Sequence, residues 1–201
     1  DIDVDKNNNI WITTENVLYK YDTKTEKIEP YQETQHITNL NCLEVDRMNN
    51  IWIGAESGLY RFNESNKTLK KYEQKDGLSE NDVNVLYQGK DHTLWIGTSQ
   101  GLNAFDEKTE EFTTYVNDPT NPTSLSYNTI NTVFQDRSGI LWVGTYKELN
   151  SLLLEQKKFN HFSLYPKYQD NLSANLAWKF ERDKSGNLWI ASGNGLHIYD
   201  E

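Results

Sequence analysis

The chain has little that could cross-link it, anchor it in a membrane or attract polyanions. Among its 201 residues is one cysteine, Cys42, which excludes an internal disulfide framework and a zinc site of four cysteines, and leaves the compartment open. No run of eighteen apolar residues occurs, and the first residues lack the basic and apolar regions of a signal peptide. With a formal net charge of -10, the chain is a poor partner for nucleic acid or anionic lipid.

Aromatic residues, in contrast, are abundant. They make up 12% of the chain and include six tryptophans and twelve tyrosines, which favours ordered packing over disorder. A mean hydropathy of -0.81 indicates that much of the surface is polar. The composition therefore predicts an ordered globular protein.

A repeated motif organises these aromatic residues. The stretch "DRSGILWVGT" at 136–145 has four counterparts in the chain, including "DRMNNIWIGA" and "DKSGNLWIAS". Self-similarity at a nearly fixed period is typical of proteins that are built from repeated structural units. The repeated tryptophans are Trp11, Trp52, Trp95, Trp142 and Trp189.

Each repeat predicts four short strands. An alternating segment leads through a tight Asn-Asn or Ser-Gly turn into the tryptophan strand, and a turn of small residues leads into two further strands. Four antiparallel strands per 40 to 47 residues, without helical periodicity, match a β-propeller blade. The predicted fold is all-β, with four complete blades and a fifth that lacks its outer strand, as a closed five-bladed ring or part of a larger one. The blades are expected at about 1–31, 42–72, 85–115, 132–165 and 178–201.

Two recurring residues indicate how the blades pack. An aspartate precedes the tryptophan by six residues in four repeats, with Gly89 in the third, and a small residue follows it by two. We expect each indole to fill the space between sheets, and the small residue to admit the neighbouring blade. The five indoles are expected to form one continuous core.

The repeat has a specific likeness to a known family. The pattern D-x-x-G-x-L-W-[IV]-G-T followed by G-L, with "NDPTNPTSLSYN" between repeats, resembles the two-component regulator propeller repeat. This resemblance covers essentially the whole chain. It implies a seven-bladed ring, the periplasmic sensor region of a membrane-anchored hybrid histidine kinase, and oligosaccharides as the sensed ligands. Nothing in the chain resembles a kinase, receiver or DNA-binding segment.

The candidate ligand site follows from propeller geometry. Loops that lead into the first strand of each blade share one face with the turns after the tryptophan strands, so their side chains converge around the central channel. Tyrosine and tryptophan faces stack on sugar rings, while asparagine and glutamate bond hydroxyl groups. The candidates are Glu15, Glu56, Tyr127, Asn128, Tyr146, Lys147, Trp178 and Asn194.

Three features of the sequence could indicate catalysis or metal binding, but none of them predicts it. "GTSQG" fits a nucleophile elbow around Ser99, but the same turn recurs without serine and leads into a strand instead of a helix. "DIDVDKNNN" alternates oxygen ligands like a calcium loop but lacks its glycine and distal glutamate. The four histidines show no ligand spacing. No catalytic residue, metal site or cofactor is therefore predicted.

Three functions remain open from the sequence. The first is a non-catalytic sensor module that binds an oligosaccharide and contacts other blades or subunits of the same protein. The second is a scaffold that docks proteins on its face or blade edges. The third is an enzyme similar to the streptogramin lyases, which would need a histidine and an acid on one face; the scattered histidines disfavour it.

Overall fold

A computed structural model describes residues 1–162, 176–193 and 195–199 as five antiparallel sheets, four of four strands and one of three. Within each sheet every strand pairs with the next in sequence, which confirms the predicted propeller blades. Beyond the strands, the described residues contain two short 3-10 turns, Gln32–Thr34 and Gln74–Asp76. The strands are β1 (Ile2–Val4), β2 (Ile10–Thr13), β3 (Leu18–Asp22), β4 (Lys27–Pro30), β5 (Leu40–Val45), β6 (Asn50–Ala55), β7 (Gly58–Asn63), β8 (Thr68–Tyr72), β9 (Val83–Gln88), β10 (Thr93–Thr98), β11 (Gly101–Asp106), β12 (Glu111–Tyr115), β13 (Ile130–Gln135), β14 (Leu141–Thr145), β15 (Leu149–Leu153), β16 (Lys158–Phe162), β17 (Ala177–Arg182), β18 (Leu188–Ser192) and β19 (Gly195–Tyr199).

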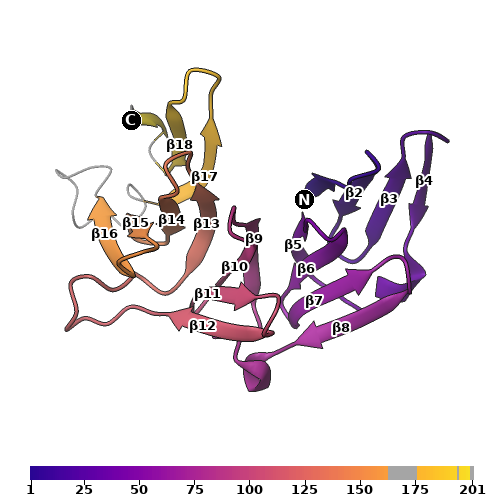
Figure 1. Cartoon of the computed structure of the whole chain (residues 1–201), viewed down its shortest axis with the longest axis horizontal. Coiled ribbons are helices and arrows are strands. Elements are labelled where there is room, and N and C mark those ends of the chain that lie inside the picture. The colour runs from indigo at the N-terminus through magenta and orange to yellow at the C-terminus, as the bar shows by residue number, and fades with distance from the viewer. Residues whose placement is uncertain (163–175, 194, 200–201) are drawn as a thin grey trace.

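The sheets follow one another in an arc around a common centre (Figure 1). Their first strands face this centre, and β5 packs beside β1 and β9, while β13 packs beside β9 and β17. The outer strands β4, β8, β12 and β16 lie on the periphery, and the first and fifth sheets stand at the two ends of the arc. The inner strands therefore surround a central channel.

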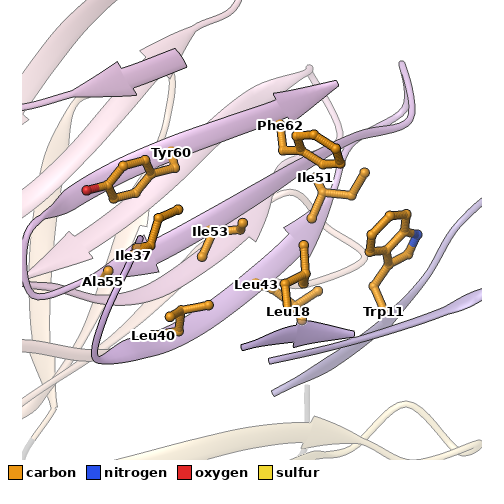
Figure 2. Close-up of a cluster of buried hydrophobic side chains, with 10 residues drawn as sticks. All are labelled: Trp11, Leu18, Ile37, Leu40, Leu43, Ile51, Ile53, Ala55, Tyr60 and Phe62. Atoms are coloured by element: carbon orange, nitrogen blue, oxygen red, sulfur yellow. The ribbon is translucent and has the colours of Figure 1, made fainter. Parts of the chain in front are cut away.

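The core is divided among the gaps between successive sheets. Figure 2 shows the first gap, where Trp11 and Leu18 of the first sheet meet side chains of the second, including Ile51 and Phe62. Trp52, Trp95 and Trp142 occupy the corresponding places in the next three gaps. The expected continuous core is instead four clusters, because each of the three middle sheets has two buried faces and separates the cluster on one face from the cluster on the other.

Glycines permit this close approach of sheets, as the repeat predicts. A Cβ atom at Gly97 would lie 2.5 Å from Val85 Cγ1 and 2.6 Å from Cγ2 of Ile130, which belongs to the next sheet. A Cβ atom at Gly144 would lie 2.9 Å from the Cβ atom of Ala177, again in the next sheet. Such separations leave no room for a side chain.

The aspartate of the repeat joins its tight turn to its indole. Asp46, 2% exposed, accepts hydrogen bonds from the backbone N–H groups of Met48 and Asn50, both at 2.8 Å. Its second oxygen accepts from the Asn50 amide and from Trp52 Nε1, again at 2.8 Å. Equivalent bonds from indole to aspartate occur in the first, fourth and fifth sheets. The aspartate is thus a structural residue that satisfies a buried donor.

Two apolar faces are left open at the ends of the arc. On the first sheet Ile2, Val4 and Ile28 are 64%, 52% and 57% exposed. On β19 of the fifth sheet Leu196 and Ile198 are 63% and 57% exposed. These are the faces that would pack against a neighbouring sheet elsewhere in the arc.

Candidate functional site

A cavity of about 600 Å³ lies where inter-sheet loops and turns meet the channel, and we call it the mouth cavity. Its walls come from the starts of β5, β9, β13 and β17 and from the turns after β6 and β10. Sequence elements far apart in the chain therefore contribute to one site. The lining residues are Asn41, Glu56, Asp82, Asn84, Ser99, Thr129, Asn131 and Trp178.

β-Bulges in the inner strands direct four of these side chains. The pairing register shifts once in each of β5, β9, β13 and β17, and the residue left out of the register is Asn41, Asn84, Asn131 or Trp178. A bulge re-aims the side chain of its extra residue. All four bulged residues line the mouth cavity, so three amides and one indole surround it.

The amides also connect neighbouring sheets. Asn41 Nδ2 donates to the carbonyl of Val83 at 3.0 Å, and Asn84 Nδ2 donates to the carbonyl of Ile130 at 3.1 Å. Each bond joins a bulge to the next inner strand and holds the wall in place. At the fourth position Trp178 replaces the amide, and its side chain is 57% exposed. An indole face is therefore available at the rim.

Two carboxylates give the mouth cavity a negative wall. Burial, followed by the charges of Glu56 and Glu80, raises the pKa of Asp82 above its ordinary value, although a hydrogen bond with Ser99 opposes this. Glu56 Oε2 accepts a 2.6 Å hydrogen bond from Asn39 Nδ2, which positions its carboxylate. No lysine, arginine or histidine is among the described residues that line the cavity.

A smaller hollow of about 180 Å³ adjoins the mouth cavity and shares Ser99 and Thr129 with it. Tyr127 and Asn128 line this hollow. The Tyr127 ring lies against Tyr146, with centroids 6.0 Å apart and an angle of 36° between the planes. These two rings are 42% and 46% exposed, so they form an aromatic surface beside the hollow.

The eight predicted site residues thus fall into separate groups. Glu56 and Trp178 line the mouth cavity, whereas Tyr127 and Asn128 line the smaller hollow. Tyr146 lies beside that hollow, against the Tyr127 ring. Glu15 and Lys147 are exposed on turns and line neither space, and Asn194 lies outside the described residues. Sequence reasoning missed Asn41, Asp82, Asn84, Thr129 and Asn131, and considered Ser99 only as a nucleophile.

The features considered for chemistry have structural partners. Ser99 leads into strand β11 and not into a helix, so an elbow geometry is absent there. The carboxylates of Asp1 and Asp3 accept backbone hydrogen bonds from Leu43 and Val45. Burial raises the pKa of the Cys42 thiol to about 12, which makes it a packing group and not a reactive thiolate.

Beneath the mouth lies a channel cavity of about 310 Å³, which shares Asn131 and Trp178 with it. Glu44 lines this channel and accepts a 3.0 Å hydrogen bond from the backbone N–H of Gln88. Burial first, and then the charge of Asp3, raises the pKa of Glu44 to about 8. The carboxyl group is therefore largely protonated at neutral pH.

This pKa predicts a pH-dependent stability. The folded state holds a proton on Glu44 up to about pH 8, whereas the unfolded chain releases it near its ordinary value of 4.5. The folded state thus binds more protons between these values, and the free energy of unfolding falls as the pH rises through them. We expect Glu44→Gln to flatten the fall in Tm between about pH 5 and pH 9 in thermal unfolding followed by circular dichroism. An unchanged slope would contradict this assignment.

Comparisons with known proteins agree with this architecture. A family model described as two component regulator propeller matches residues 77–100 and 124–147. The third and fourth sheets thus carry two-component regulator propeller repeats. Each matched stretch runs from an inter-sheet loop through a bulged inner strand to the turn after the tryptophan strand. The two-component regulator propeller repeat therefore includes the segments that line the mouth cavity in the third and fourth sheets.

Solved structures share the fold at low sequence identity. The extracellular domain of a protein assigned to a hybrid two-component system of B. thetaiotaomicron is 24% identical, with a TM-score of 0.80, over 99% of this chain and 28% of its own. Virginiamycin B lyase from Staphylococcus aureus is 15% identical, with a TM-score of 0.74, over 98% of this chain and 64% of its own. PorZ from Porphyromonas gingivalis is 16% identical, with a TM-score of 0.77, over 98% of this chain and 31% of its own. No curated protein matches the sequence.

Within the described residues, no helix has the length and apolar character to span a bilayer. The chain spans only 28% of the first of these structures, so its repeats correspond to one part of a larger protein there.

Proposed function

We propose that the chain is a non-catalytic ligand-binding part of an extracytoplasmic sensor, and that it binds an oligosaccharide at the mouth cavity. The observation that carries this proposal is the convergence of four bulged residues on one cavity, with the exposed Trp178 indole among them. An exposed indole stacks on a sugar ring, while amides, hydroxyl groups and carboxylates bond its hydroxyls. The fold shared with a two-component extracellular domain supports a sensor.

Signalling requires that ligand binding change the structure of the protein away from the binding site. The mouth cavity is built from four sheets that Asn41 and Asn84 link to their neighbours. A ligand that contacts several walls at once stabilises one arrangement of the sheets over others. In the proposed role, a kinase in another part of the protein reads that arrangement.

A docking scaffold is the second candidate. The open faces at Ile2 and Val4 and at Leu196 and Ile198 favour it, because contiguous exposed apolar surface marks interaction sites. A lyase is less well supported. None of the described residues that line the mouth cavity is a histidine, although the fold is shared with virginiamycin B lyase.

Thermal unfolding with a panel of oligosaccharides separates these roles. We expect one sugar class to raise Tm, since a ligand at 100 times its Kd adds about 2.7 kcal/mol to the free energy of unfolding. Trp178→Ala should abolish the rise. Ile28→Ala removes an apolar side chain of the same 57% exposure on β4 and should leave it intact. No rise with any sugar would reject ligand sensing by these blades and favour the scaffold.

A further inference from the structure

The charge of the mouth cavity restricts which ligand fits it. The carboxylates of Glu56 and Asp82 line the cavity, and the other described lining residues are neutral. Neither carboxylate forms a salt bridge within the described part of the chain, whereas Glu64, Glu73 and Glu110 do. The cavity therefore carries negative charge that no side chain of its own wall neutralises.

The surroundings of Asp82 disfavour the ionised form of its carboxyl group. Burial and the charges of Glu56 and Glu80 all disfavour its ionised form, and Ser99 provides one opposing hydrogen bond. A cation placed between Glu56 and Asp82 would relieve the repulsion between the two carboxylates. Its attraction to both of them offsets the desolvation penalty that a charged group bears and a neutral hydroxyl group does not. An anionic sugar would add to the repulsion.

The indole and the channel point to the same ligand charge. The face of an exposed tryptophan attracts a cation as well as a sugar ring. Below Trp178 the channel is lined by the carboxylates of Asp1 and Asp3, by Lys179, and by Glu44, which is largely protonated at neutral pH and adds little charge. The carboxylates of Asp1 and Asp3 thus extend the acidic lining from the mouth into the channel.

We propose that the mouth cavity selects oligosaccharides that carry protonated amino groups, an inference that rests on the proposed function. One sugar ring stacks on Trp178, and its ammonium group lies between the carboxylates of Glu56 and Asp82. The amides of Asn41, Asn84 and Asn131 bond neighbouring hydroxyl groups. Neutral, N-acetylated and uronic-acid sugars offer the same ring without the charge that this wall requires.

Calorimetric titration of the chain at low ionic strength tests this selectivity. The probes are a glucosamine trisaccharide, its N-acetylated counterpart, a glucose trisaccharide, a galacturonate trisaccharide and spermidine. We expect the glucosamine trisaccharide to bind at least about 10-fold more tightly than each of the others, because a charge-assisted hydrogen bond exceeds a neutral one. Equal or tighter binding of any other probe would overturn the proposal.

Variants assign the selectivity to the two carboxylates. Glu56→Gln and Asp82→Asn keep the side-chain shape and should each weaken glucosamine trisaccharide binding by about 10-fold. Glu111→Gln removes an exposed carboxylate from β12 and should have no effect. Unchanged affinity in both cavity variants would also overturn the proposal.

The outcomes distinguish the charge preference from sugar binding itself. If a neutral trisaccharide binds best and Trp178→Phe weakens it, the mouth cavity is a sugar site and only the preference for an amine is wrong. If no trisaccharide binding depends on Trp178, the proposed function fails together with the preference.

Discussion

Replacing Gly97 with valine is expected to lower the free energy of unfolding by about 3 kcal/mol. A Cβ atom there would overlap Val85 Cγ1 and Ile130 Cγ2, at 2.5 Å and 2.6 Å, and the further methyl groups of valine have no free space. The side chain would push the third sheet away from the fourth and disturb the cluster around Trp95. Urea unfolding followed by circular dichroism measures the loss.

Ala191→Val is the matched control for this substitution. Ala191 occupies the equivalent place in β18, but no further sheet of the described chain covers that side, where Leu196 is 63% exposed. We expect a change within about 0.5 kcal/mol, as at other open surface positions. Equal losses in the two variants would mean that contact between sheets does not explain the glycine.

Asp46→Ala is expected to cost about 3 kcal/mol of stability, and Asp46→Asn less. The aspartate accepts four hydrogen bonds in its turn, including one from the buried Trp52 Nε1. Alanine leaves these donors without their partner, while the indole remains 0% exposed between the second and third sheets. Thermal and urea unfolding both report the change.

The third sheet provides a natural comparison. Gly89 stands where the other repeats have aspartate, and Trp95 Nε1 is a buried donor with no hydrogen-bond partner among the described residues. We therefore expect the paired change Gly89→Asp and Asp91→Ser to stabilise the chain, since Asp91 Oδ1 lies 2.9 Å from a Cβ atom at Gly89 and would obstruct the new carboxylate. A loss of stability in this variant would argue against the aspartate as the main partner of the indole.

The sequence alone predicts the propeller because its strongest signals are local. The spacing of Trp52 and Trp95, the turn before each and the glycine after each reflect contacts made within one repeat or with the next. Positive φ angles at Asn49, of 68°, and at Gly139, of 91°, confirm the turns expected from Asn-Asn and Ser-Gly. The tryptophan and the turn before it recur in every repeat, and a small residue, glycine in three of the five, follows each tryptophan by two.

The mouth cavity was only partly predictable, because it depends on where a bulge turns each side chain. The alignment of Trp178 with Asn41, Asn84 and Asn131 is visible in the sequence, but a one-residue register shift decides which face of the strand each occupies. Lys147 was predicted from its turn on the correct face, yet position on that face does not bring its side chain into the cavity. Nothing in the sequence distinguishes Asp82 as a site residue, since acidic residues are common in the chain's loops.

The central claim, that ligands bind in the mouth cavity, is tested most directly by fluorine NMR of the chain labelled with fluorotryptophan. Six indoles give six resonances, and Trp178→Phe identifies that of Trp178 by its loss. Addition of the glucosamine trisaccharide should shift the Trp178 resonance progressively and leave those of Trp11, Trp52 and Trp95 in place, since these three indoles are at most 2% exposed. If the sugar binds while the Trp178 resonance stays unchanged, the ligand site lies elsewhere and the account is wrong.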